Sequence, residues 1–243
     1  MKTSERHHLK TNEVAERVGE LWHSWEENRQ KTLTWAAIGL ALVALVGGFF
    51  WWQTTRAQSA AAQLAEALSV ADAPIVGANT PPGTPPPAGL FFTSEQTRAE
   101  AAVQKFLAVA DAHGSSQEAL AARYHAAALL ASLGKATDAE KHYQAVVDRD
   151  GAGIYGRMAK LGLAELQASL GRYDAAIATY RELAARTDTD LPVDGILMQL
   201  ARTYRQAGKT TEAAQTFNRI VEEFPDSLYA AEARQALEAA RQP

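Results

Sequence analysis

The sequence contains no cysteine. This absence excludes disulfide bonds, thiolate zinc sites, iron–sulfur clusters and a cysteine nucleophile, although a chain without thiols suits either redox compartment. An excess of charge of one sign is also lacking, because 24 Lys and Arg stand against 28 Asp and Glu in 243 residues, for a net charge of −4. So balanced a chain gives no reason to expect a nucleic-acid partner.

Side chains that carry chemistry do not occur at the spacings that chemistry needs. None of the six histidines is paired with another histidine or a carboxylate at metal-ligand spacing: His7, His8, His23, His113, His125 and His142. The segment Gly208-Lys209-Thr210 resembles the end of a phosphate loop, but Thr203 stands where that loop needs an earlier glycine. We therefore expect no enzyme, no catalytic residue, no cofactor and no metal.

A long apolar run occupies residues 33–52, where twenty consecutive residues carry no charge. As a helix with about 1.5 Å rise per residue it would span roughly 30 Å, the thickness of a bilayer's hydrocarbon core. Trp35 lies near one end, and Trp51 and Trp52 close the other, as in an interfacial aromatic belt. A cleaved signal peptide or a buried soluble helix are the alternatives. The pattern predicts an uncleaved transmembrane helix over 32–52.

Basic residues orient this helix. Six Lys and Arg precede it in residues 1–31, whereas only Arg56 follows it before Arg98. The positive-inside bias places the N-terminus in the cytoplasm and residues 53–243 outside, as in a single-pass protein of a bacterial inner membrane. Residues 11–28 show an amphipathic helical pattern with two tryptophans. This part of the cytoplasmic segment 1–31 is a juxtamembrane helix, an interfacial helix or a docking site for a membrane partner.

Two connecting segments follow. Residues 53–72 are alanine-rich and predict a helical stalk that continues out of the membrane. Six of the nine prolines lie between Pro74 and Pro87, so residues 73–92 are expected to be an extended, semi-rigid linker. A ligand for a proline-recognition domain is the alternative for this linker.

The remaining residues repeat with a period of 37. Gly134, Gly171 and Gly208 mark polar breaks between helical patterns, and the same side-chain types recur after each of them. Alanine comes five residues after each glycine, an aromatic residue nine after and a branched apolar residue twelve after: Ala139, Ala176, Ala213, Tyr143, Tyr180, Phe217, Val146, Leu183 and Ile220. The phase one period earlier gives Ala102, Phe106 and Val109. This pattern predicts stacked antiparallel helix pairs with a glycine turn inside each pair.

These positions resemble the tetratricopeptide repeat, with Ala127, Ala164 and Ala201 at its small-residue position in the first helices and Pro225 near the end of the last unit. The period exceeds the family's usual length of about 34, and we place the extra residues between pairs, at 148–154 and 186–192. The resemblance implies an all-α helical-hairpin solenoid over 93–243, behind one N-terminal transmembrane helix. Residues 93–112 are expected to form an unpaired second helix, and 227–241 a closing helix.

In this family the first helices of the pairs usually line the concave face. The repeat phase assigns to that face Tyr124, Ala128, Met158, Leu161, Glu165, Met198, Arg202, Arg205 and Gln235. Candidate partner-binding residues are Tyr124, Met158, Leu161, Met198, Arg202 and Arg205, of which the methionines would suit an adaptable apolar ligand and the arginines a carboxylate. The alternative is that the apolar residues are core and the arginines a solvated face. The Lys/Asn carboxylate clamp known in the family has Tyr124 and Ala128 at its positions here.

The whole layout also resembles a narrower family, the YfgM-like ancillary subunits of the bacterial Sec translocon. That resemblance implies a non-enzymatic, membrane-anchored periplasmic adaptor that assists the translocon and periplasmic chaperones with secreted chains. An envelope-assembly or cell-division scaffold of the same repeat fold is the alternative, and an enzyme or sensor that docks through its repeats is a third. The expected partners are proteins and, through residues 33–52, the membrane, and the oligomeric state is left open.

Overall fold

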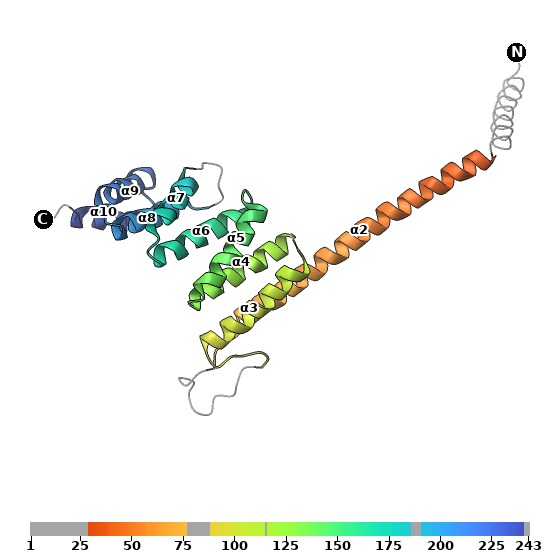
Figure 1. Ribbon diagram of the computed structural model, residues 1–243, viewed down its shortest axis with the longest axis horizontal. Helices are drawn as coiled ribbons and strands as arrows, with labels where there is room; N and C mark the ends of the chain where they lie inside the picture. Colours follow the sequence, from red (N-terminus) through yellow and green to blue (C-terminus); the bar gives the residue numbers. More distant parts are fainter. Residues whose placement is uncertain (1–28, 77–87, 115, 186–190, 241–243) are drawn as a thin grey trace, which may run out of the picture. The chain divides into compact units, whose positions relative to one another are not determined.

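The computed structural model describes residues 29–76, 88–114, 116–185 and 191–240. Regular structure in this part of the chain is helical apart from one isolated β-bridge, which confirms the all-α prediction (Figure 1). The helices are α2 (Arg29–Ala71), α3 (Glu95–Ala112), α4 (Gln117–Ser132), α5 (Ala136–Asp150), α6 (Ile154–Ser169), α7 (Tyr173–Ala184), α8 (Val193–Gln206), α9 (Thr210–Glu223) and α10 (Ala230–Ala239). The amphipathic pattern at 11–28 lies outside the described residues.

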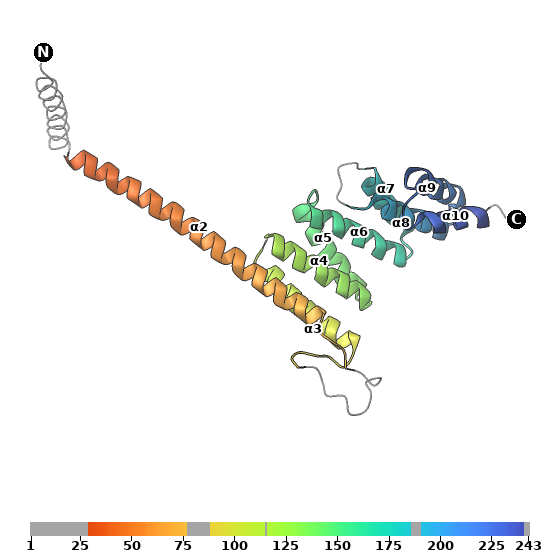
Figure 2. The same ribbon diagram turned by 180° about the vertical axis from the view of Figure 1, so that it is seen from behind.

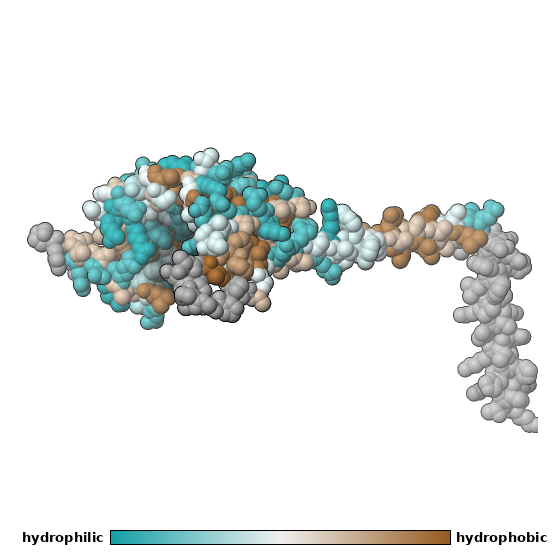
Figure 3. All heavy atoms as spheres, turned by 90° about the horizontal axis from the view of Figure 1, so that it is seen from below, coloured by the Kyte–Doolittle hydropathy of each residue, from teal (hydrophilic) through white to brown (hydrophobic). Residues whose placement is uncertain are grey.

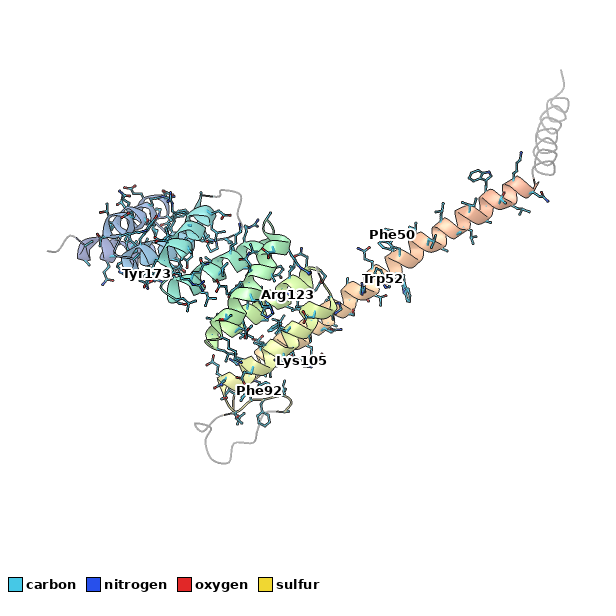
Figure 4. All side chains as sticks on the ribbon, viewed as in Figure 1. Phe50, Trp52, Phe92, Lys105, Arg123 and Tyr173 are labelled. Atoms are coloured by element: carbon cyan, nitrogen blue, oxygen red, sulfur yellow. The ribbon has the colours of Figure 1, made fainter. Side chains whose placement is uncertain are left out.

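The chain divides into two compact units, Met1–Arg56 and Ala57–Pro243. In the first unit, α2 is long and apolar enough to cross a membrane, and none of its most apolar stretch is buried within the protein. Figure 3 shows an apolar band on this helix, and Phe50 and Trp52 project outward from it (Figure 4). The guanidinium carbon of Arg56 lies 4.6 Å from the centre of the Trp52 ring. An apolar surface ending in an aromatic–cation contact is typical of a membrane interface.

In the second unit, the end of α2 packs against α3. Ala67 and Val70 share an apolar cluster with Phe106 of α3, and the Glu66 carboxylate binds the Lys105 ammonium at 2.7 Å. Figures 1 and 2 show the two helices side by side. The prediction that residues 93–112 form an unpaired helix is therefore wrong. The last part of the expected stalk, from Ala57 onward, is instead the first helix of an additional pair.

The two ends of the proline-rich connection between α2 and α3 lie next to each other. The backbone N–H of Phe92 donates to the carbonyl of Pro74 at 3.0 Å, and the N–H of Val76 donates to the carbonyl of Phe92 at 2.8 Å. These bonds form the single bridge between Ile75 and Phe92. The two described ends of this connection are therefore bonded to each other and do not hold two domains apart, as a spacer would. Residues 77–87 between them lie outside the described part.

Each turn inside the next three pairs ends its first helix in the same way. Gly134, Gly171 and Gly208 have φ angles of 73°, 72° and 75°. After Gly134, the N–H of Lys135 donates to the carbonyl of Leu130 at 2.9 Å, and equivalent bonds follow the other two glycines. This is a Schellman turn, which needs a left-handed residue that glycine provides without steric cost.

The core follows the repeat phase. Every residue predicted from the period, in both helices of each pair, is buried: Ala102, Phe106, Val109, Ala127, Ala139, Tyr143, Val146, Ala164, Ala176, Tyr180, Leu183, Ala201, Ala213, Phe217 and Ile220. Consecutive helices pack on one another, and the first helices α4, α6 and α8 also contact each other in that order. The closing helix α10 packs on α9. The fold is therefore a helical-hairpin array, as predicted.

Candidate protein-interaction surface

The first helices α4, α6 and α8 form one layer, and we call its solvent side the first-helix face. Tyr124, Met158 and Leu161 are half-buried there. The Tyr124 ring contacts two neighbouring rings, with its centroid 5.4 Å from that of His125 and 6.0 Å from that of Tyr143. These three predicted residues therefore keep part of their surface accessible to a partner.

The structure places two other predicted residues differently. Met198 has no exposed surface and lies in the apolar cluster of the C-terminal pairs, so it is not available to a partner and the prediction for it is wrong. The Arg202 guanidinium binds both carboxylate oxygens of Glu232 on α10, at 3.0 and 2.6 Å. The Arg202 guanidinium, which was expected to bind a partner's carboxylate, is therefore already bound to Glu232. Arg205 is exposed, with its guanidinium carbon 6.0 Å from the Phe217 ring centre.

An acid–tyrosine cluster is formed by Tyr124 of α4, Glu165, which is exposed on α6, and the buried Tyr143 and Tyr180 of α5 and α7. Partial burial raises the pKa of the Glu165 carboxyl. Burial also raises the pKa of the three tyrosines, and the Glu165 charge adds to the effect in each case. The charge of one carboxylate on α6 therefore acts on tyrosines of α4, α5 and α7.

This cluster was missed as a site, although its signal was in the sequence. The aromatic position of the repeat holds tyrosine at its two central occurrences, Tyr143 and Tyr180, and phenylalanine at the two outer ones, Phe106 and Phe217. Tyrosine at a core position usually brings its hydroxyl to a polar partner or to water. The change from phenylalanine to tyrosine therefore marks the central interfaces.

Glycine lets one of these rings approach. A Cβ added to Gly162 of α6 would lie 2.5 Å from Cζ and 2.7 Å from the hydroxyl oxygen of Tyr143. The tip of the Tyr143 ring therefore packs directly on the α6 backbone, one turn before Glu165.

A separate hollow lies among α3, α4 and α5, away from the predicted face. Its polar lining includes Glu100, Lys135 and His142, and the Lys135 ammonium lies 3.6 Å from the Glu100 carboxylate. The Nδ1 atom of His142 is buried without a hydrogen-bond partner, and burial lowers the pKa of its ring. Nothing in the sequence pattern predicted this hollow. Among the described residues, no group of three or more His, Asp or Glu could hold a metal ion.

Comparisons with known proteins give the repeat family. A family model described as tetratricopeptide repeat-like domain matches residues 22–189, more than half of the chain, and one described as tetratricopeptide repeat matches 196–227. The longer match begins before α2 and includes it. No curated protein matches the sequence.

One solved structure supports the fold. The chain is similar to a crystal structure of nearly identical TPR-like repeats of a putative kinesin light chain from Podosopora anserina, with 17% identity, a TM-score of 0.50 and coverage of 60% of this chain and 87% of that one. It is also similar to the Rap conjugation gene regulator of the plasmid pLS20 in complex with the Phr* peptide, with 17% identity, a TM-score of 0.49 and coverage of 61% and 44%.

Proposed function

The chain belongs to the tetratricopeptide repeat-like family, and on this premise we propose that it is a membrane-anchored periplasmic adaptor that assists the Sec translocon and periplasmic chaperones with secreted chains. Tetratricopeptide repeat proteins are generally scaffolds for protein–protein interaction and typically non-catalytic. The observation that carries the proposal is the joining of such a repeat array to one exposed apolar helix in a single family match.

The membrane side of the proposal rests on length and charge. The exposed apolar run of α2 is long enough to span a bilayer, and six Lys and Arg precede it while Arg56 stands alone after it until Arg98. This asymmetry favours a cytoplasmic N-terminus. The repeats and the partners they bind would then lie in the periplasm.

The absence of native cysteine makes the topology directly testable. A Leu228→Cys variant introduces one thiol at a residue that is 96% exposed, and Thr3→Cys is the matched variant before the apolar helix. We expect a membrane-impermeant maleimide to label Leu228→Cys in intact spheroplasts and Thr3→Cys only after lysis. The reverse pattern would place the repeats in the cytoplasm and contradict the periplasmic adaptor.

Partner identity needs crosslinking in intact cells, followed by mild-detergent purification and identification of the bound proteins. A photo-crosslinking residue at Ala128, half-buried on the first-helix face, is compared with one at Arg181, exposed on α7. Recovery of translocon subunits and periplasmic folding factors, stronger from position 128, is the expected result. Recovery of division or outer-membrane assembly proteins instead would transfer the function to an envelope scaffold.

A further inference from the structure

The Glu165 carboxylate on the first-helix face is a charge without a partner. Three other described glutamates, Glu140, Glu223 and Glu232, accept hydrogen bonds from arginine side chains at 2.6–3.1 Å. Within the described part of the chain, neither a hydrogen bond nor an ion pair reaches Glu165. Glu165 is exposed, but a carboxylate that loses part of its contact with water and stays unpaired still costs stability. It is a position where a partner's charge would recover that cost.

The groups around Glu165 suit a cation. The ring of Tyr124, half-buried on α4, offers an aromatic face, and a guanidinium or ammonium group is attracted to such a face. Tyr143 and Tyr180 are buried, at 4% and 1% exposure, so of the three tyrosines Tyr124 is the one open to a partner. The Tyr124 hydroxyl can accept a hydrogen bond from a bound cation, because a phenolic oxygen is both a donor and an acceptor.

The neighbouring surface offers an apolar side chain and an arginine that is already paired, while the exposed Arg205 lies further along α8. Leu161 lies one turn before Glu165 on the same side of α6 and is half-buried. The nearest predicted cation on the following first helix, Arg202, is already held by Glu232 at 2.6 Å. An acidic partner segment would therefore meet an unpaired carboxylate, whereas a basic one would meet its complement.

We propose that the first-helix face binds an extended segment of a partner polypeptide through one basic side chain, which the Glu165 carboxylate and the Tyr124 ring receive, while an apolar neighbour of that side chain contacts Leu161. This inference names the chemistry of the chain recognised in the proposed function and rests on that function only for the partner being a polypeptide. It requires the repeat array but neither the periplasmic topology nor the translocon.

The test measures binding of synthetic peptides to the full chain in detergent by fluorescence anisotropy. The probe is a fluorescein-labelled Ala-Leu-Ala-Arg-Ala-Leu-Ala peptide, and its match replaces the arginine with citrulline, which has the same shape and no charge. We expect the arginine peptide to bind roughly tenfold more tightly, as for a charge-assisted hydrogen bond in a partly dry site. The Glu165→Gln variant should reduce that ratio to about one, because it removes the charge and keeps the shape.

The matched control is Glu212→Gln, which removes an exposed carboxylate from the first turn of α9 and should leave the tenfold ratio intact. Equal binding of the two peptides to the parent chain would overturn the inference, as would an unchanged ratio in Glu165→Gln or the absence of measurable binding. Failure of the crosslinking experiment with an intact Glu165-dependent ratio would remove the translocon function and leave this inference standing.

Discussion

Gly162 lies inside α6, where glycine weakens a helix by roughly 0.5–1 kcal/mol relative to alanine. At this position the missing side chain makes room for the Tyr143 ring, which would lie 2.5 Å from an added Cβ. The ring is itself buried at 4% exposure, so it has little space into which it can move. A residue that is unfavourable for the helix is therefore favourable for the contact between helices.

The Gly162→Ala variant should lower the free energy of unfolding by about 1–3 kcal/mol, because overpacking outweighs the gain in helix propensity. The matched control is Gly195→Ala in α8, where the nearest atom to an added Cβ is Cε2 of Tyr229 at the ordinary distance of 3.5 Å. That variant should be neutral or stabilising. Chemical denaturation measures both, and equal effects of the two variants would contradict the steric account.

Glu165 should make stability depend on pH in an unusual direction. Burial raises the pKa of its carboxyl in the folded state, so its contribution to stability is present below the unfolded pKa of about 4.3 and is lost as pH rises through the folded pKa. The Glu165→Gln variant, which resembles the protonated form, should be more stable than the parent near neutral pH. The difference should vanish in acid.

Glu140 serves as a control, because its effect on stability should change with pH in the direction opposite to that of Glu165. Hydrogen bonds from Arg172 lower the pKa of its carboxyl, so its contribution is present above the unfolded pKa and is lost as pH falls through the folded one. Glu140→Gln should therefore be less stable than the parent near neutral pH. Thermal unfolding across a pH series measures both variants, and the same sign for the two would show that Glu165 is not desolvated.

At the scale of elements, ion pairs connect successive helix pairs with the period of the sequence. The residue after each turn glycine is basic and reaches back to an acid on the preceding second helix: Lys135 to Glu100, Arg172 to Glu140 and Lys209 to Asp174, at 3.6, 2.8 and 2.7 Å. These pairs are exposed, so each contributes little alone. They recur at every turn and therefore favour one register of the stack.

The pairing of α2 with α3 also belongs to this scale. The alanine-rich sequence of α2 does not distinguish one side of the helix from another. In the structure, however, Ala67 is completely buried while Ala65 is exposed. Small residues let two helices approach closely, and the apolar side of α3, which includes Phe106, needs such a cover. The end of α2 therefore serves as the N-terminal boundary of the repeat array.

Substituting leucine separates a free stalk from a packed helix. Ala67→Leu should reduce the stability of the repeat array by about 1–3 kcal/mol, since no space exists for the added atoms. Ala65→Leu adds the same atoms to the exposed side and should change stability by no more than about 0.5 kcal/mol. Urea denaturation followed by circular dichroism measures the two variants. A neutral Ala67→Leu would mean that α2 does not cover α3 in solution.

At the scale of the unit Ala57–Pro243, the core is divided rather than central. Three apolar clusters follow one another along the array: one around Phe106, one around Tyr143 and one around Tyr180 and Phe217. In a repeat array each unit contacts only its neighbours, and stability is close to a sum of local terms. Damage at one end is therefore expected to stay near that end.

Ile220→Ala tests this locality. Ile220 is completely buried in the C-terminal cluster, and its truncation should cost about 2–5 kcal/mol. Hydrogen exchange should increase in α8, α9 and α10 more than in α3 and α4. Leu228→Ala is the control, because Leu228 is 96% exposed and its loss should leave exchange unchanged. A uniform increase over the whole array would contradict local stability.

The sequence determined by itself whatever depends on local backbone and period. A left-handed turn residue favours glycine, so Gly134, Gly171 and Gly208 were visible without a structure. The recurrence of alanine and aromatic residues behind them identified the buried positions, because each pair must cover the same surface of the next. The apolar run of α2 was equally plain, since bilayer thickness translates directly into residue number.

Only the tertiary structure decided what lies over each position. Leu161 and Met198 stand at the same point of successive repeats, three residues before Ala164 and Ala201, yet Leu161 is half-buried and Met198 fully buried. Arg202 is held by Glu232 from a helix thirty residues further along the chain. Such outcomes depend on which distant segment packs there, and that is set by the summed free energy of contacts across the fold rather than by any local pattern of residues.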